Sequence, residues 1–248
     1  MLGGGAIGAA LGLPARAQGG RIGLAGLVEL PELTLPGGKK IKATLMLPAR
    51  LPAPAVALVH DRWGPDDSVY ERVEAMVADR YVALMVDYLD GATPKDEPQA
   101  QAAIQALTRA DAADTVAAWL NWLLADARVN RAVGIIGWGL GAGLALEAAT
   151  RVPLKAAVLY YPDFKRKQDE MQRVSCPMLA HFSARDSAAA AEFESALAQA
   201  RRTDRVFNYE ADRDFADSTR PSFKRSEAAL AWNRSVAFLR ANLGKPPG

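Results

Sequence analysis

The chain has 248 residues, a formal net charge of +2 at pH 7 and one cysteine; 50% of its residues are hydrophobic and 23% are charged. This balance is typical of a globular protein with a sizeable core, in one large α/β domain or two small ones. The low net charge, without a dense stripe of Lys or Arg, argues against a nucleic acid as partner. A single cysteine, Cys176, excludes an internal disulfide.

The first 18 residues, MLGGGAIGAALGLPARAQ, differ from the rest because they are small and apolar up to Arg16. Ala15-Arg16-Ala17 matches the A-x-A pattern of a signal-peptide cleavage site, although a basic region before the apolar run is missing. The run is too short for a transmembrane helix, and no later stretch reaches that length. We therefore predict an export leader over 1–18 and a periplasmic or secreted location. A plain Ala/Gly leader on a cytoplasmic protein is the alternative.

From residue 22 onward, patterns typical of strands alternate with patterns typical of helices. We expect strands over 27–35, 39–49, 53–60, 81–89, 132–136, 155–161, 177–182 and 205–209, and helices over 69–80, 99–124, 140–150, 188–202 and 221–242. Gly37-Gly38 predicts a hairpin connection, and the charged stretch 163–172 predicts a loop or helix. Such alternation indicates a mostly parallel twisted sheet with helices on both faces. We predict one α/β domain over 19–248, ending in a loose tail.

A glycine-rich turn joins one predicted strand to the next helix in VGIIGWGLGAGLAL, residues 133–146. Gly137, Gly139 and Ala142 match the dinucleotide pattern G-x-G-x-x-G/A, and Asp163 lies near the end of the next strand. The match is weak because at least two strand–helix units precede this one, whereas the fingerprint belongs to the first. The same turn also fits a hydrolase nucleophile elbow, G-x-S-x-G, in which Gly139 would stand at the nucleophile position.

Several ordered stretches favour the hydrolase interpretation. They are LVHDRWGPDDSVYERVEAMVADRYVALMVDYLDG, GIIGWGLGAGLAL, VSCPMLAHFSARD, VFNYEADRDFAD and AWNRSVAFLRANL. Together, over residues 40–242, they resemble the dienelactone hydrolase family of α/β-hydrolases, whose elbow normally reads G-[WYF]-C-[FLM]-G-G. The resemblance implies an α/β-hydrolase fold and hydrolysis of carboxylic esters or lactones by a nucleophile, a histidine and an acid.

Carried over residue by residue, the resemblance places Gly139 at the nucleophile, Asp186 at the acid and Asp214 at the histidine. A shift by one residue finds Arg213 or Phe215, so no nearby alignment restores a base. Asp61 stands where active relatives carry a glutamate. Acyl transfer needs a nucleophile and a base. The backbone N–H of Leu140 and one near Arg62 could still form an oxyanion hole.

Other residues could in principle replace the triad. His60 and His181 are interpreted as structural, and Ser183, Ser187 and Ser218 lack an evident base. The carboxylates of Asp186 and Asp214 would repel each other if they were close. Three arginines could compensate them, namely Arg62, Arg185 and Arg213. Alternatively, Asp214 points into solvent.

We therefore expect a protein of dienelactone hydrolase type that has lost its nucleophile and base. Its role would be a catalytically silent binding or accessory subunit of an exported assembly, with a protein partner or small ligand at the former pocket. A hydrolase of small esters or lactones with non-standard residues is the first alternative, and a dinucleotide-binding protein using Gly137, Gly139 and Ala142 is the second. We predict no cofactor and no metal, since no ligand spacing supports one.

Overall fold

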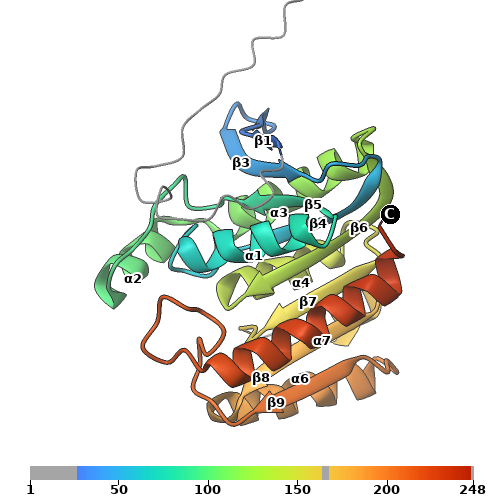
Figure 1. The fold of residues 1–248 in the computed structure, drawn as a ribbon. Helices are drawn as coiled ribbons and strands as arrows, with labels where there is room; N and C mark the ends of the chain where they lie inside the picture. Colours follow the sequence, from blue (N-terminus) through green and yellow to red (C-terminus); the bar gives the residue numbers. More distant parts are fainter. Residues whose placement is uncertain (1–26, 164–167, 247–248) are drawn as a thin grey trace, which may run out of the picture.

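The computed structural model describes residues 27–163 and 168–246, and their strands join one sheet in the order β1-β3-β5-β4-β6-β7-β8-β9, with β2 also paired to β3 (Figure 1). The strands are β1 (Leu27–Glu29), β2 (Glu32–Thr34), β3 (Lys40–Leu47), β4 (Ala53–Val59), β5 (Val82–Val86), β6 (Val129–Trp138), β7 (Ala156–Tyr160), β8 (Met178–Ser183) and β9 (Arg205–Tyr209). The predicted leader over 1–18 and the last two residues of the predicted tail lie outside the described residues.

The helices alternate with these strands from β4 onward. They are α1 (Asp67–Ala78), α2 (Glu97–Ala106), α3 (Arg109–Ala125), α4 (Leu140–Ala149), α5 (Gln168–Arg173), α6 (Ser187–Gln199) and α7 (Arg225–Leu243), with a 3-10 turn η1 (Ala184–Asp186) before α6. None of the helices in the described ranges is both long and apolar enough to cross a membrane.

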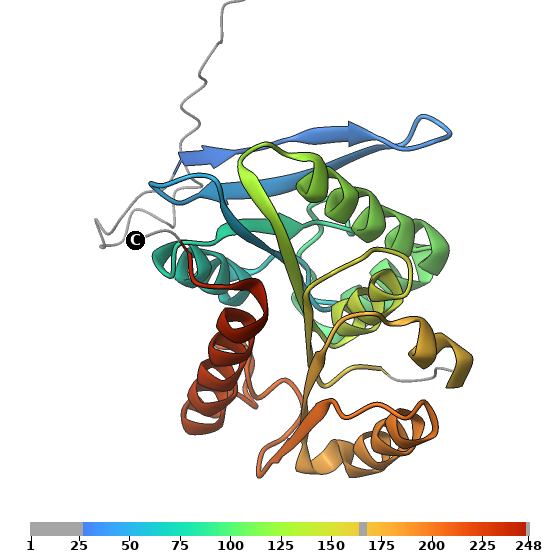
Figure 2. The same cartoon turned by 90° about the vertical axis from the view of Figure 1, so that its right-hand side faces the viewer.

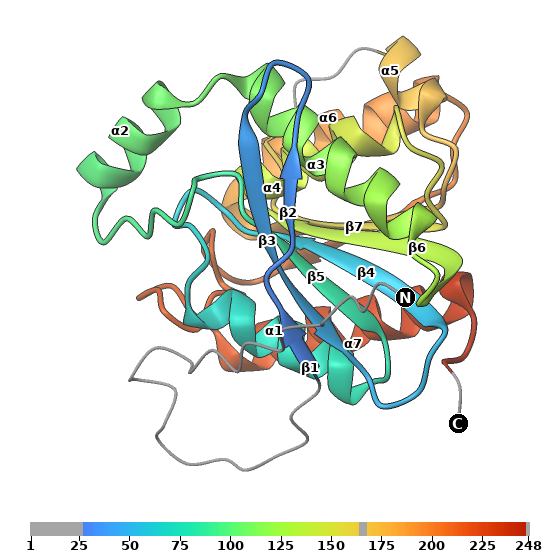
Figure 3. The same cartoon turned by 90° about the horizontal axis from the view of Figure 1, so that it is seen from above.

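The sheet is parallel from β5 to β9 and antiparallel where β3 meets β1, β2 and β5. Helices α1 and α7 cover one face, and α3, α4 and α6 cover the other (Figures 2 and 3). Alternate residues of β4 serve the two layers: Val56 and Leu58 pack toward α1 and α7, and Ala57 and Val59 toward α3 and α4. The predicted α/β fold class is confirmed, and the predicted hairpin connection joins β2 to β3.

The single long helix expected over 99–124 is wrong, because the chain forms two helices there, α2 and α3. Leu107 and Thr108 both have extended backbone between them, and Thr108 is the N-cap residue of α3. Thr108 and Asp111 have the spacing of a helix-start pattern, T-x-x-D, although the Thr108 side chain makes no capping hydrogen bond. The spacing of the apolar residues therefore did not reveal the break between the two helices, whereas the polar residues Thr108 and Asp111 indicated it.

Close packing of glycines fixes the turn from β6 into α4. A Cβ on Gly137 would lie 2.5 Å from the Gly141 carbonyl oxygen, and one on Gly141 would lie 2.1 Å from the His60 carbonyl oxygen. Helix α4 can therefore approach the end of β4 only because these positions have no side chain. This approach brings the start of α4 next to the residues that follow β4.

We predict that Gly141→Ala lowers the free energy of unfolding by about 3 kcal/mol, because its methyl group would overlap backbone atoms that cannot move independently. Gly143→Ala is the matched control in the same helix. A Cβ there would lie 3.3 Å from the Arg109 side chain, and alanine improves helix propensity, so the change should stay below about 1 kcal/mol. Urea denaturation of both variants measures this. Equal losses would contradict the packing explanation.

Candidate functional site

The predicted site positions lie where parallel strands end, at one edge of the sheet. Asp61 follows β4, Gly139 follows β6, Asp186 follows β8, and Asp214 lies in the loop after β9. In open α/β sheets this edge is where ligands bind. The structure brings Asp61, Gly139 and Asp214 together, whereas Asp186 joins the group through Arg213.

The Asp61 carboxylate fills the space directly beside Gly139. A Cβ built on Gly139 would lie 2.1 Å from Asp61 Oδ2 and 2.3 Å from its Cγ, far inside van der Waals contact. The backbone of Gly139 has φ +50° and ψ −115°, a conformation that L residues rarely adopt. The backbone conformation would be strained for any other residue, and the position of the Asp61 carboxylate leaves no room for a side chain at 139.

Two backbone N–H groups hold that carboxylate in place. Asp61 Oδ1 accepts hydrogen bonds from the N–H of Leu140 at 2.8 Å and of Arg62 at 2.7 Å. These are the two donors that the sequence suggested for an oxyanion hole. In this structure they bind a side chain of the protein itself, so a substrate carbonyl oxygen has no free donor there unless Asp61 moves.

The electrostatic environment makes the charge on Asp61 unfavourable. Burial, and then the negative charge of Asp214, raise the pKa of Asp61 to about 6, against the two backbone hydrogen bonds, which lower it. Asp61 Oδ2 is buried without a hydrogen-bond partner among the described residues. Burial also raises the pKa of Asp214, while the charges of Arg62 and Arg213 act in the opposite direction.

Arg213 binds the acid position through an ion pair. Its Nη1 donates to Asp186 Oδ1 at 3.1 Å, and its Nη2 donates to Asp163 Oδ1 at 2.7 Å and to the Tyr161 carbonyl at 3.0 Å. Ser183 Oγ donates to the other oxygen of Asp186 at 2.7 Å. Asp186 is therefore held by an arginine and a serine, and Asp163 is engaged in the same cluster.

Asp214 is buried rather than pointed into solvent, with 8% of its surface exposed. Its closest cation is Arg62, whose Nη2 lies 3.8 Å from Asp214 Oδ2 and also donates to Glu97 at 3.3 Å. Of the three candidate arginines, Arg213 and Arg62 therefore compensate the two aspartates. Arg185 instead pairs with Asp212 at 2.5 Å on the surface.

Both histidines have contacts that fit a structural role. The His60 ring stacks on Tyr88 with centroids 4.2 Å apart, and its Nε2 lies 3.5 Å from Asp87. His181 is enclosed in the core, where its two ring nitrogens contact Tyr209 Oη at 2.8 Å and Ser235 Oγ at 2.9 Å. Burial lowers the pKa of His181 to about 3, so the ring is neutral at physiological pH.

The candidate serines donate hydrogen bonds to carboxylates or lie exposed on the surface, and none has a histidine partner among the described residues. Ser218 Oγ donates to Glu71 at 3.2 Å, and Ser183 donates to Asp186 as described. Ser187 is exposed at the start of α6. No imidazole is placed to activate any of these three hydroxyl groups in the part of the chain that the structure describes.

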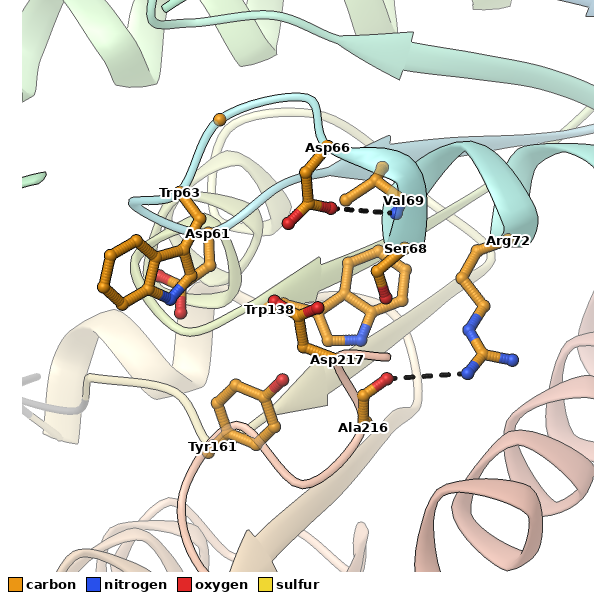
Figure 4. A pocket seen from close by; sticks show the side chains of 11 residues that line it. Asp61, Trp63, Asp66, Ser68, Val69, Arg72, Trp138, Tyr161, Ala216 and Asp217 are labelled. Carbon is orange, nitrogen blue, oxygen red and sulfur yellow. Dashed lines mark hydrogen bonds between the residues drawn. The ribbon is translucent and has the colours of Figure 1, made fainter. Parts of the chain in front are cut away.

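A small cavity of about 20 Å³ lies beside Asp61, enough for about one water molecule (Figure 4). Trp63, Trp138, Tyr161 and Asp217 surround it (Figure 4). The sequence did not single out Trp63, which contacts two arginines: the guanidinium carbons of Arg62 and Arg220 are 4.7 and 4.3 Å from its ring centroid. The neighbouring Arg62 in the stretch DRWG was the sequence feature that could have drawn attention to Trp63.

The geometry does not favour the dinucleotide alternative. Close packing in the elbow accounts for Gly137 and Gly141, and the N-terminal N–H of α4 faces the Asp61 carboxylate, which would repel a phosphate. Asp163 binds Arg213 instead of standing free for a ribose. Within residues 27–163 and 168–246, no cluster of three or more His, Cys, Asp or Glu residues is arranged to hold a metal ion.

Comparisons with known proteins agree with this architecture. Residues 41–243 match the model of the dienelactone hydrolase family. A carboxymethylenebutenolidase from Pseudomonas putida is 25% identical over 224 residues, covering 85% of this chain and 95% of the relative. A dienelactone hydrolase-like promiscuous phosphotriesterase from metagenomic libraries superposes with a TM-score of 0.79 at 19% identity, covering 89% of this chain and all of that one. A dienelactone hydrolase from Anabaena variabilis gives 0.68 at 20% identity, with 89% and 100% covered.

The raised pKa of Asp61 predicts a specific pH dependence of stability. Between its ordinary pKa of 3.8 and about 6, the folded protein binds more protons than the unfolded chain, so the free energy of unfolding falls as pH rises through this window. The fall should be on the order of 1–3 kcal/mol. Asp61→Asn should remove it, as measured by urea denaturation at pH 4 and pH 8.

Asp90→Asn is the matched control, since Asp90 is exposed and has a left-handed backbone that asparagine also tolerates. It should leave the difference between the two pH values unchanged. An Asp61→Asn variant with the wild-type difference would show that another group is responsible.

Proposed function

Because the chain belongs to the dienelactone hydrolase family, we propose that it is a catalytically silent member, without a nucleophile at Gly139 or a base at Asp214. It would serve as a binding or accessory subunit of an exported assembly, in the periplasm or outside the cell. Cytoplasmic residence is the alternative if residues 1–18 are not an export leader.

The position of the Asp61 carboxylate is the observation that most supports this proposal. It lies where a side chain at position 139 would begin, and it uses both N–H groups that would stabilise an oxyanion. Loss of either nucleophile or base from a working triad typically costs on the order of a millionfold in turnover. Because Asp61 also engages the two oxyanion donors, few of the groups that a triad hydrolase uses would be left for catalysis.

The dimensions of the former pocket support a role other than turnover. A cavity of about 20 Å³ does not hold an ester or lactone in this conformation. A ligand there would need Asp61 or the loop containing Asp217 to move, whereas a protein partner could use the outer surface. Both kinds of partner remain part of the proposal.

A hydrolase of small esters or lactones acting through Asp61 and Asp214 is the second candidate. The two buried carboxylates, each with a raised pKa, favour it, since such groups can act as general acids and bases. It ranks lower because neither carboxylate has an imidazole partner among the described residues and because Asp61 is enclosed.

A substrate screen separates the two candidates. We expect no turnover of short acyl esters or lactones above the buffer rate, and the same result for Asp61→Asn and Asp214→Asn. Size-exclusion chromatography of the protein purified from its native source should show it in a larger assembly. Turnover that Asp61→Asn or Asp214→Asn abolishes would overturn the proposal of a silent subunit and establish the hydrolase.

Rebuilding the triad tests the assignment of positions. Gly139→Cys alone should remain inactive, because the new Cβ collides with Asp61 and no base is present. Gly139→Cys with Asp61→Ala frees the space and the N–H groups, and addition of Asp214→His supplies a base. We expect the triple variant to hydrolyse p-nitrophenyl acetate at least about 100-fold faster than the double variant. Equal rates would show that position 214 is not the histidine position.

A further inference from the structure

A second concavity lies at the opposite edge of the sheet, where β8 and β9 begin. It is a groove of about 720 Å³, bounded by α7, by the turn from α6 into β9, and by the residues before β8. Helix α7 and strand β9, which both supply lining residues, are seen in the lower part of Figure 2. The volume lies within the range of small-molecule sites and far exceeds that of the cavity beside Asp61. The groove shares no lining residue with that cavity.

Four arginines line the groove, and only one has its charge compensated by the groove itself. Arg202 pairs with Asp204 at 2.6 Å and also donates to the Cys176 carbonyl at 2.6 Å. Arg201, Arg205 and Arg234 have no ion pair with a described carboxylate. The groove therefore has an excess of positive charge, in a chain whose overall net charge is only +2.

Arg234 is held with its guanidinium group in a fixed orientation. Its guanidinium carbon lies 4.0 Å from the centroid of the Phe207 ring, and its Nη1 donates to Tyr209 Oη at 3.0 Å. The remaining N–H groups of the fork are available to an acceptor. The positive charge of Arg234 also acts on the core, where it contributes to the lowered pKa of His181. A stacked arginine loses less side-chain entropy when it binds an oxyanion.

The floor and the α7 side of the groove are apolar. Phe207 and Phe238 are half-buried, Leu179 is buried, and Ala237 and Ala241 present methyl groups from α7. An apolar body can therefore lie between α7 and the sheet while an acidic group reaches the arginines. Arginines beside an apolar surface fit an amphiphilic anion better than a simple inorganic anion. An inorganic anion would leave the apolar surface exposed to water.

We propose that this groove binds a small amphiphilic anion, an aromatic or aliphatic body with a carboxylate or phosphate group. Arg234 and Arg205 bind the oxyanion through paired N–H groups, and Phe207 and Phe238 contact the apolar body. Guanidinium forks match the two oxygens of a carboxylate or phosphate. The site is independent of the former catalytic edge, and its ligand need not be a substrate.

Calorimetric titration with 2-naphthoate and 2-naphthyl phosphate tests the proposal on the full chain. We expect saturable binding with Kd of about 1 mM or tighter for at least one of them, the better probe identifying the acidic group. Neutral 2-naphthamide and inorganic phosphate should each bind at least tenfold more weakly. Arg234→Met and Arg205→Met should each weaken binding of the better probe on the order of tenfold.

Arg225→Met is the matched control, since Arg225 is exposed in the first turn of the same helix and lies outside the groove. It changes the net charge equally and should leave binding unchanged. Arg205 is exposed, so its replacement tests the site even if Arg234→Met fails to fold. No binding of either probe, equal binding of the amide, or equal losses in all three variants would overturn the proposal. None of these results depends on whether the chain hydrolyses esters.

Discussion

A carboxylate bound by two backbone N–H groups determines how the edge of this sheet is built. Asp61 reaches from the end of β4 to the first N–H of α4, and it also accepts from the N–H of Arg62. It can do so only because Gly139 leaves the intervening space free. The contact joins two neighbouring strand ends and excludes other acceptors from the same donors. The cost is a charge in a buried position, which is visible as a raised pKa.

The surrounding residues reduce that cost with cations rather than with a neutral imidazole. Arg213 joins Asp186 to Asp163, and Arg62 lies between Asp214 and Glu97. An arginine cannot accept a proton at physiological pH, so these pairs stabilise loops without offering a base. The same arrangement explains why an aspartate with a left-handed backbone, Asp214, can remain buried in the loop after β9. Among the described residues, the ion-pair partners of Asp186 and Asp214 are therefore arginines.

Sequence patterns predicted most of this fold for identifiable reasons. The apolar runs of β4 to β8 are nearly continuous because both faces of the sheet are covered, and glycines mark the β6–α4 turn because backbone atoms meet there. The break at Leu107 and Thr108 was missed because no glycine or proline stands within residues 99–124 to mark it. The four candidate positions at the sheet edge followed from the resemblance to the dienelactone hydrolase family. That Asp61 occupies the oxyanion donors could not be predicted, since it depends on how far one side chain reaches between strands. The groove under α7 was also missed, because its arginines come from separate elements.

The hydrogen bond to the first N–H of α4 couples two positions that lie far apart in the chain. Gly139, as N-cap residue, has no side chain to satisfy this N–H, so a residue 78 positions earlier in the chain serves as the cap of this helix. A mutation that introduces a side chain at 139 must displace that cap, and a mutation that removes Asp61 leaves the first N–H of the helix unsatisfied. Positions 61 and 139 are therefore epistatically coupled, so the effects of substitutions at the two positions on stability should not add.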